Sequence, residues 1–164
     1  MPDNHFHTSL TPAFKEKLYR LNDLMPLFRE KLAQGKTVRF YPKGTSMRPM
    51  LRQGIDSVVL SPLPKKLKKY DLPLYQRDNG QYVLHRIVAV GDTYTCIGDN
   101  QYEYEQGVRH DQMIGLVTGF YRDQEYHSVS ELSHRTYCFL WHHSRRVRPK
   151  LRAARAKLKN LIKK

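Results

Sequence analysis

Residues that cross-link a chain, coordinate metals or cross a membrane are scarce in this sequence. It contains two cysteines, Cys96 and Cys138, among 164 residues, too few for a disulfide framework or a zinc site. No stretch approaches the roughly 18 consecutive apolar residues of a membrane-spanning helix, and the first residues lack the charged-then-apolar layout of a secretory signal. A glycine-rich phosphate loop is also absent from the sequence. We therefore expect a cytoplasmic protein without a metal or a cofactor.

Acidic residues are scarce as well, and the imbalance is local. The chain has 29 Lys and Arg against 15 Asp and Glu, a formal net charge of +14. Ten of the basic residues and none of the acidic ones follow Trp141. The remaining 19 basic and 15 acidic residues give an ordinary balance for a folded domain. The excess charge therefore belongs to a basic C-terminal tail.

Hydrophobic periodicity divides the chain into three segments, residues 1–35, 36–130 and 131–164. In the first segment, Thr11-Pro12 is typical of a helix start, and apolar residues then recur at spacings of three and four. This apolar stripe consists of Phe14, Leu18, Leu21, Met25 and Phe28. We expect Pro26 to kink or split the helix and Gly35 to end it. The segment is interpreted as a helical region packed on the domain.

From residue 36 the apolar period becomes two, which indicates β-strands. The expected strands span residues 37–41, 56–60, 72–77, 81–90, 93–97, 113–121 and 125–129. Asp78-Asn79-Gly80 suits a tight turn and predicts a hairpin between the third and fourth of these strands. Short strands joined by tight turns favour a mainly β fold, in which an antiparallel sheet coils on itself.

The third segment predicts a basic amphipathic helix after Pro149. Its apolar side carries Leu151, Leu158, Leu161 and Ile162, and Lys or Arg occupy most other positions. Such a helix can lie on an anionic membrane, bind nucleic acid or cover the domain as a solvated helix. Nucleic acid is the least favoured partner, because purely electrostatic binding does not need an apolar stripe. Peripheral contact of residues 145–164 with the inner face of a membrane and a plain structural role both stay open.

The segment Gly44-Thr45-Ser46-Met47-Arg48-Pro49 and the downstream residue His85 carry the clearest chemical signal. A serine attacks a carbonyl only when a base removes its proton, and the pKa of histidine suits that task near neutral pH. Alternation places His85 on an apolar face of its strand, together with Val83 and Ile87. A core histidine without a catalytic role would show the same pattern.

These residues resemble the signal peptidase I and LexA-like superfamily of serine peptidases, over roughly residues 37–120. In that superfamily the nucleophilic serine precedes Met-x-Pro, as Ser46 does here, and the base is a histidine in the branch of endoplasmic-reticulum-type signal peptidases. Leu84-His85-Arg86-Ile87-Val88 is similar to that branch, and Gly98-Asp99-Asn100 matches its Gly-Asp-Asn box. The resemblance implies a coiled antiparallel fold like a β-barrel, with Ser46 as nucleophile and His85 as general base.

A third catalytic residue would orient the His85 ring. Asp99 matches the family's box, although an aspartate there can also be a turn former that bonds its own backbone. In the histidine branch the orienting acid lies a few residues beyond the box, where this chain has Glu103 and Glu105. We expect Asp99 to be the orienting acid, with Glu105 as the second choice.

Backbone donors beside the serine complete the expected site. Gly44 lets the backbone turn sharply and approach a bound peptide. The amide of Ser46, together with a neighbouring amide or the Thr45 hydroxyl, can donate hydrogen bonds to the oxyanion of a tetrahedral intermediate.

The sequence thus predicts a serine endopeptidase, a hydrolase related to signal peptidases that acts on a peptide or protein through a Ser46–His85 dyad. Members of the resembled family are usually anchored in the membrane whose exported substrates they trim. No anchor is expected here, so an exported peptide or propeptide is only one class of substrate that fits. The alternative is a catalytically inactive domain of the same fold that binds a peptide or a partner protein.

Overall fold

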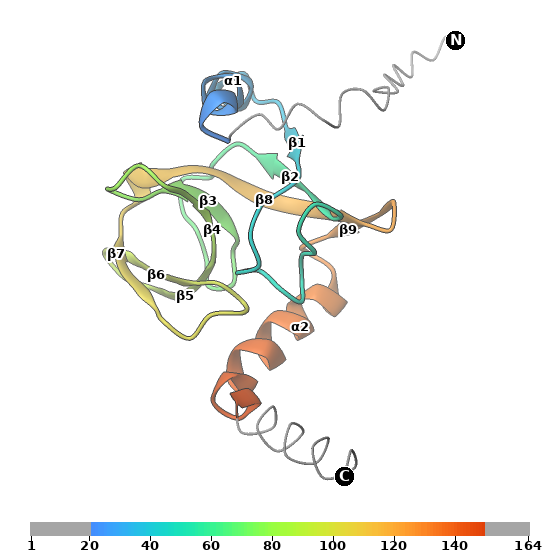
Figure 1. The fold of residues 1–164 in the computed structure, drawn as a ribbon. Coiled ribbons are helices and arrows are strands. Elements are labelled where there is room, and N and C mark those ends of the chain that lie inside the picture. The colour runs from blue at the N-terminus through green and yellow to red at the C-terminus, as the bar shows by residue number, and fades with distance from the viewer. Residues whose placement is uncertain (1–20, 150–164) are drawn as a thin grey trace, which may run out of the picture.

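Two antiparallel β-sheets with a helix at each end make up residues 21–149, the part of the chain that the computed structural model describes (Figure 1). The larger sheet has six strands in the order β1-β2-β8-β3-β4, with β9 also paired to β8. Its strands are β1 (Val38–Phe40), β2 (Ser57–Ser61), β3 (Pro73–Gln76), β4 (Tyr82–Leu84), β8 (Met113–Arg122) and β9 (Glu125–Ser128). The smaller sheet has the order β5-β6-β7 and consists of β5 (Arg86–Val90), β6 (Tyr94–Ile97) and β7 (Glu105–Val108).

The long strand β8 organises the larger sheet, because β2, β3 and β9 all pair with it. Its Gly115 is needed for close packing: a Cβ there would lie 2.8 Å from Leu60 Cγ and 2.9 Å from the carbonyl oxygen of Ser61. The main core contains Val58, Leu60 and Val117, each with none of its surface exposed. Strand propensity and burial therefore agree in this part of the chain.

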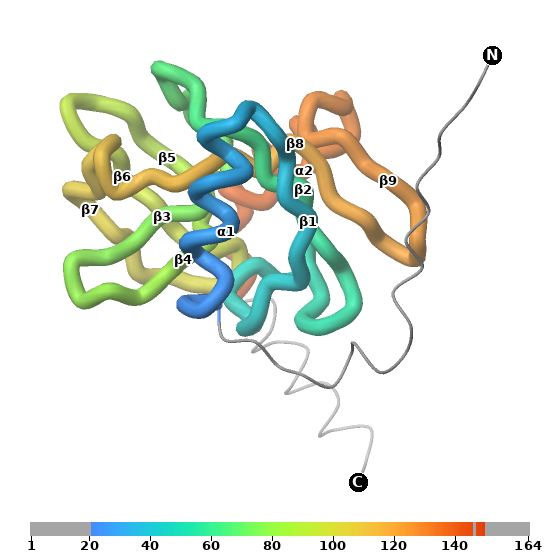
Figure 2. Tube along the Cα trace, turned by 90° about the horizontal axis from the view of Figure 1, so that it is seen from above, coloured from blue at the N-terminus to red at the C-terminus, as the bar shows by residue number. Residues whose placement is uncertain are grey.

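Helix α1 (Leu21–Ala33) lies against the larger sheet beside β1 (Figure 2). It buries Met25, Phe28 and Leu32 in the same core. The helix is not split at Pro26, contrary to one of the two expectations for that residue. Gly35 ends it as expected: its φ is +75°, and the Lys36 amide donates to the carbonyl of Lys31 at 3.0 Å, the pattern of a glycine C-cap. The predicted helix start at Thr11 lies outside the described residues.

Helix α2 (Leu132–His143) and a 3₁₀ turn, η3 (Ser144–Arg146), follow the last strand. They occupy the first part of the segment expected to be a basic tail. The basic amphipathic helix predicted after Pro149 lies outside the described residues. Within residues 21–149, no helix is both long and apolar enough to cross a membrane.

The fold is mainly β and antiparallel with a helix at either end, as the sequence predicted. The two sheets of the described region are not closed into a barrel. The expected single strand over residues 81–90 is wrong, because β4 pairs with β3 and β5 pairs with β6 in the other sheet. His85 is the residue between these two strands, so it lies where the chain passes from one sheet to the other.

Candidate active site

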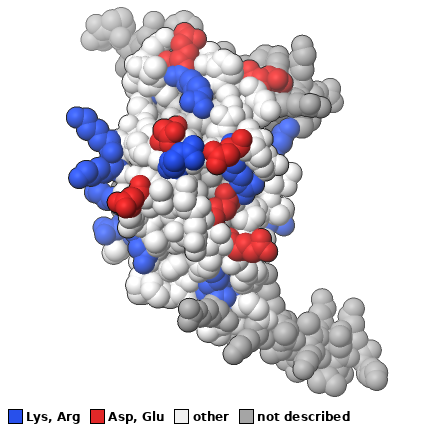
Figure 3. Space-filling model, turned by 90° about the vertical axis from the view of Figure 1, so that its left-hand side faces the viewer, with Lys and Arg blue, Asp and Glu red and all other residues white. Residues whose placement is uncertain are grey.

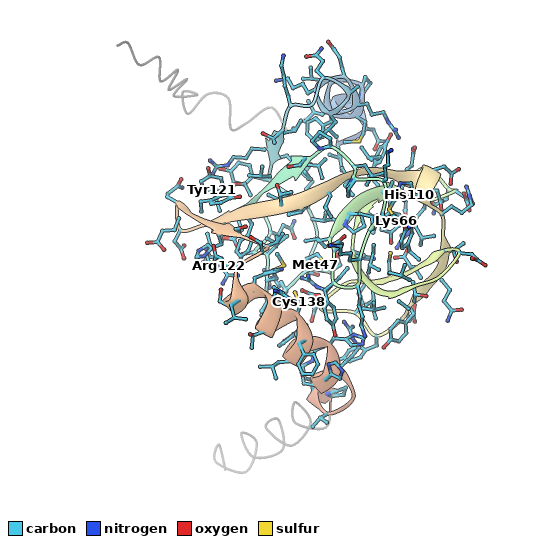
Figure 4. The ribbon with its side chains drawn as sticks, turned by 180° about the vertical axis from the view of Figure 1, so that it is seen from behind. Met47, Lys66, His110, Tyr121, Arg122 and Cys138 are labelled. Atoms are coloured by element: carbon cyan, nitrogen blue, oxygen red, sulfur yellow. The ribbon has the colours of Figure 1, made fainter. Side chains whose placement is uncertain are left out.

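Ser46 lies in the connection between β1 and β2, on a segment anchored from within the molecule. Met47 and Met50 of this segment are buried, and Figure 4 shows Met47 in the interior, between β8 and α2. The Leu51 amide donates to the carbonyl of Met47 at 2.9 Å. Gly44 has a φ of +94°, a conformation that favours glycine, so the chain turns just before the serine. Ser46 itself is half-buried.

The Gly98-Asp99-Asn100 segment packs directly on the serine segment. The Asn100 amide donates to the carbonyl of Ser46 at 2.7 Å, and the Asn100 side chain donates to the carbonyl of Thr45 at 3.3 Å. A Cβ on Gly98 would lie 2.8 Å from the Ser46 carbonyl oxygen and 3.0 Å from Ser46 Cβ. Glycine is therefore required at position 98 because the serine backbone occupies the space of a side chain. Two of the motifs found in the sequence are thus in contact.

His85 is buried and paired with Glu105. The residue is 2% exposed, and its Nδ1 lies 2.7 Å from Glu105 Oε1. Glu105 is the first residue of β7 and is also held by two other side chains. The Tyr75 hydroxyl donates to Oε2 at 2.9 Å, and Arg77 donates through Nε to Oε2 at 2.8 Å and through a terminal nitrogen to Oε1 at 2.5 Å. The carboxylate therefore fixes the orientation of the histidine ring.

The electrostatics of this group keep the acid ionised and the histidine neutral. Burial tends to raise the pKa of Glu105, but the hydrogen bonds from Arg77 and Tyr75 outweigh it and bring the pKa below 4.5. Burial lowers the pKa of His85 below 6.5, more than the Glu105 carboxylate raises it, and the charge of Arg77 lowers it further. At neutral pH the ring is then uncharged, with its Nδ1 proton donated to Glu105 and Nε2 left as a proton acceptor.

Asp99 has a different set of partners. It forms a buried ion pair with Arg86, with Nε to Oδ1 and a terminal nitrogen to Oδ2 both at 2.9 Å. The Tyr137 hydroxyl of α2 donates to Oδ2 at 3.0 Å. Of the two acids considered from the sequence, the structure therefore places Glu105 and not Asp99 against the His85 ring.

The pairing of β5 with β6 joins the end of the chain segment that carries His85 to the start of the Gly98 segment. Arg86, the residue after His85, is opposite Ile97, the residue before Gly98. Gly98 is the residue whose backbone touches Ser46. Among the described residues, no hydrogen bond joins the Ser46 hydroxyl to the His85 ring. Ser46 contacts Gly98, and His85 contacts Tyr75 and Glu105, without a direct hydrogen bond between the two side chains.

Helix α2 and η3 hold the Gly98-Asp99-Asn100 segment from outside. Trp141 Nε1 donates to the carbonyl of Asp99 at 2.7 Å, and Arg148 donates to the same oxygen at 3.3 Å. The buried Arg145 donates to the carbonyl of Gly98 at 3.2 Å and to that of Gln101. Sequence reasoning did not find these residues, because a tryptophan and two arginines in a basic segment carry no pattern that assigns them to a distant loop.

Within residues 21–149, no three His, Cys, Asp or Glu side chains are grouped so as to hold a metal ion. Neither a protein-family model nor a curated protein matches this chain.

Proposed function

We propose that this protein is a serine endopeptidase in which Ser46 is the nucleophile, His85 the general base and Glu105 the orienting acid. The observation that carries the proposal is the contact of 2.7 Å between His85 Nδ1 and the Glu105 carboxylate. The Ser46 backbone lies against Gly98, the residue after the strand that pairs with β5. A serine, a histidine and an acid that orients the histidine are the three parts of a serine hydrolase site. The mainly β architecture agrees with the resemblance to the signal peptidase and LexA-like superfamily, whose coiled fold we propose for this chain.

In the proposed reaction, His85 Nε2 takes the proton of the Ser46 hydroxyl while Oγ bonds to the substrate carbonyl carbon. The Ser46 amide and the Thr45 hydroxyl donate to the resulting oxyanion. His85 then gives its proton to the leaving amine as the C–N bond breaks, which leaves an acyl-enzyme. A water molecule, deprotonated by His85, attacks the ester and releases the acid product and the free serine. Glu105 stabilises the imidazolium that forms in each half of the reaction.

The expected substrate is a peptide or a protein, and an exported peptide or propeptide remains the class that the family resemblance suggests. Contact of the basic tail with an anionic membrane stays a prediction. Two basic residues of that tail already have other partners, since Arg145 and Arg148 donate to carbonyls of residues 98–101.

Fluorophosphonate labelling tests the proposal, because these probes react with an activated serine hydroxyl and need no knowledge of the substrate. Wild type should form an adduct that peptide mass spectrometry maps to Ser46. Ser46→Ala should remove the adduct, whereas Ser130→Ala, which changes an exposed serine before α2, should not. Failure of wild type to label while a control serine hydrolase labels in the same tube would overturn the proposal.

The second candidate function is an inactive domain that binds a peptide or a partner protein over the same surface. It is favoured by the lack of a hydrogen bond between Ser46 and His85 in the described residues. Hydrogen bonds between catalytic groups often tighten only with substrate, so this geometry also fits a working peptidase. The labelling experiment separates the two, since an inactive domain leaves Ser46 unmodified.

A further inference from the structure

A pocket of about 250 Å³ opens beside the His85–Glu105 pair. It is lined by Arg77, Gln101, Tyr102, Glu103 and Glu105. Glu105 therefore contacts His85 and also belongs to the pocket lining. Its side chain is 24% exposed, in contrast to 3% for the histidine.

Another lining residue, Gln101, lies next to the candidate nucleophile. Gln101 Oε1 is 2.9 Å from the position that a Cβ on Gly98 would take, and Ser46 Cβ is 3.0 Å from that same position. Gln101 and Ser46 are therefore close neighbours across Gly98. A peptide whose carbonyl lies at the Ser46 hydroxyl would place a nearby side chain at the mouth of this pocket.

The charges lining the pocket leave one acid without a partner. Arg77 uses Nε and one terminal nitrogen on Glu105 and the other terminal nitrogen on Gln81 Oε1 at 2.8 Å. Glu103 is exposed and forms no ion pair or hydrogen bond with the described residues. Among the charged side chains that line the pocket, Arg77 and Glu105 pair with each other and Glu103 is left over. Behind the lining, Arg145 donates to the carbonyl of Gln101. On the side of the molecule where β6 and β7 lie, acidic and basic side chains are intermixed (Figure 3), so the nearest charges decide what the pocket attracts.

An aromatic ring adds to this preference. Tyr102 is 47% exposed and borders the pocket next to Glu103. The face of a tyrosine ring attracts cations, and an exposed carboxylate beside it supplies the opposite charge. The long aliphatic stem of Lys or Arg can cover the ring while its charged end reaches the acid.

We propose that this pocket binds a Lys or Arg side chain of the substrate, next to the bond that is cleaved, with Glu103 as the specificity-determining residue. The inference rests on the proposed peptidase function and adds a class of substrate to it. It assigns no catalytic role to Glu103, which contacts the substrate side chain and not the reacting atoms.

Tripeptidyl diphenyl phosphonates test this proposal, because they phosphonylate an activated serine at a rate that depends on their side chains. A set is prepared in which each of the three positions carries Lys, norleucine or Glu in turn, and the rate of Ser46 modification is measured at low ionic strength. At one position wild type should react faster with Lys than with norleucine, and faster with norleucine than with Glu.

Glu103→Gln should reduce the Lys rate about two- to fivefold relative to norleucine, the range expected for an exposed ion pair. Glu103→Lys should reverse the order of Lys and Glu.

The matched control is Glu125→Lys, which makes the same change of charge at an exposed residue of β9; its ratio of Lys to Glu rates should equal that of wild type. A simple fluorophosphonate is run beside the set. If it labels Ser46 but the three side chains react equally at every position, or if Glu103→Lys leaves their ratios as in wild type, the pocket assignment is wrong and the peptidase proposal stands. If Ser46 is not labelled at all, both proposals are overturned.

Discussion

Glu105 joins the candidate base to two other side chains, and these groups act together with burial on the pKa of the His85 ring. A carboxylate alone beside a buried histidine would raise its pKa and favour the charged ring. Here burial outweighs the carboxylate and keeps the pKa of His85 low, and the charge of Arg77 lowers it further. The ring is therefore oriented by Glu105 without being protonated at neutral pH, the state that a general base requires.

Arg77→Met should move the pH dependence of Ser46 modification to higher pH. Modification needs neutral His85, so in wild type its rate falls as the pH drops through the pKa of His85, which is below 6.5. Arg77 lowers the pKa of both His85 and Glu105. Its removal should therefore raise both pKa values, and the labelling rate should begin to fall at a higher pH than in wild type. Fluorophosphonate labelling rates from about pH 4 to 8 measure this fall.

Arg109→Met is the matched control for that experiment, because Arg109 is a half-exposed arginine paired with Asp78 and Asp111. Its profile should coincide with that of wild type. If the labelling rate of Arg77→Met falls at the same pH as that of wild type, or at a lower pH, the electrostatic role given to Arg77 is wrong.

Asp99 shows why sequence alone does not settle the third residue. It lies in the motif that the family resemblance highlights, yet its carboxylate is occupied by Arg86 and Tyr137. Glu105 lies six residues later, in a short polar stretch, Glu105–Val108, that shows no alternation of apolar residues. Its position against His85 depends on β7 pairing with β6, a contact that no local pattern in the sequence reveals.

At the scale of the elements, α2 is the part of the fold that steadies the serine segment. Its Trp141 binds the carbonyl of Asp99, and the neighbouring Asn100 amide binds the carbonyl of Ser46. Arg148 stacks on the Trp141 ring, 3.6 Å from its centroid, and reaches the same Asp99 oxygen. The helix therefore acts on Ser46 through one intervening segment of backbone.

Trp141→Phe should slow the labelling of Ser46 while leaving the fold intact. Phenylalanine keeps an aromatic ring beneath Arg148 but cannot donate to Asp99, and a single such hydrogen bond contributes about 1 kcal/mol, or roughly a fivefold effect. The pH at which the rate is half-maximal should not move, since Trp141 has no contact with His85 among the described interactions. Phe139→Leu, at an exposed position of the same helix, serves as the control and should label at the wild-type rate. Equal rates for Trp141→Phe and Phe139→Leu would show that the helix does not position the serine.

The same helix also makes stability depend on pH through His134. Burial, aided by the charge of Arg86, lowers the pKa of this ring to about 4. A lowered pKa means that the unfolded chain takes up a proton before the folded protein does. The stability gained from the neutral ring is therefore complete above about pH 6.5 and is lost as the pH falls towards 4.

His134→Phe should flatten this dependence. In wild type the His134 contribution to the loss of unfolding free energy between neutral pH and about pH 4 is on the order of 3 kcal/mol, and the variant should lack it. Urea unfolding at several pH values measures the difference. His143→Phe, at the exposed end of the helix, should keep the wild-type slope of unfolding free energy against pH. If His134→Phe shows a slope as steep as that of wild type, His134 is not a source of the pH dependence of stability.

Alternation and turn residues were enough to locate most strands of the fold. The hairpin around Asp78-Asn79-Gly80 is present, with Gln76 paired to Tyr82. The strand that was expected to run through His85 is instead two strands, because Leu84 pairs within one sheet and Arg86 within the other. A residue at such a crossing has one chain neighbour in each sheet. The alternation of apolar residues along the chain therefore cannot show where the chain changes sheet.

For the molecule as a whole, the candidate site is a property of how the two sheets meet. Ser46 comes from a connection of the larger sheet, Glu105 from the smaller one, and His85 from the point between them. The sequence could identify the serine and histidine by their motifs. The contact of Ser46 with Gly98, the pairing of Glu105 with His85 and the support from α2 all depend on long-range contacts, which become visible only in the folded chain.

A double-mutant cycle on Ser46 labelling tests the central claim, that Glu105 acts on the serine through His85. Labelling rates are measured for wild type, His85→Ala, Glu105→Gln and the double variant. We predict that His85→Ala slows labelling by about 10⁴-fold or more and Glu105→Gln by about 10³- to 10⁴-fold. The double variant should be no slower than His85→Ala alone, because the effects of substituting residues that act as one unit are not additive. Losses that multiply in the double variant, or a His85→Ala protein that labels like wild type, would contradict the account.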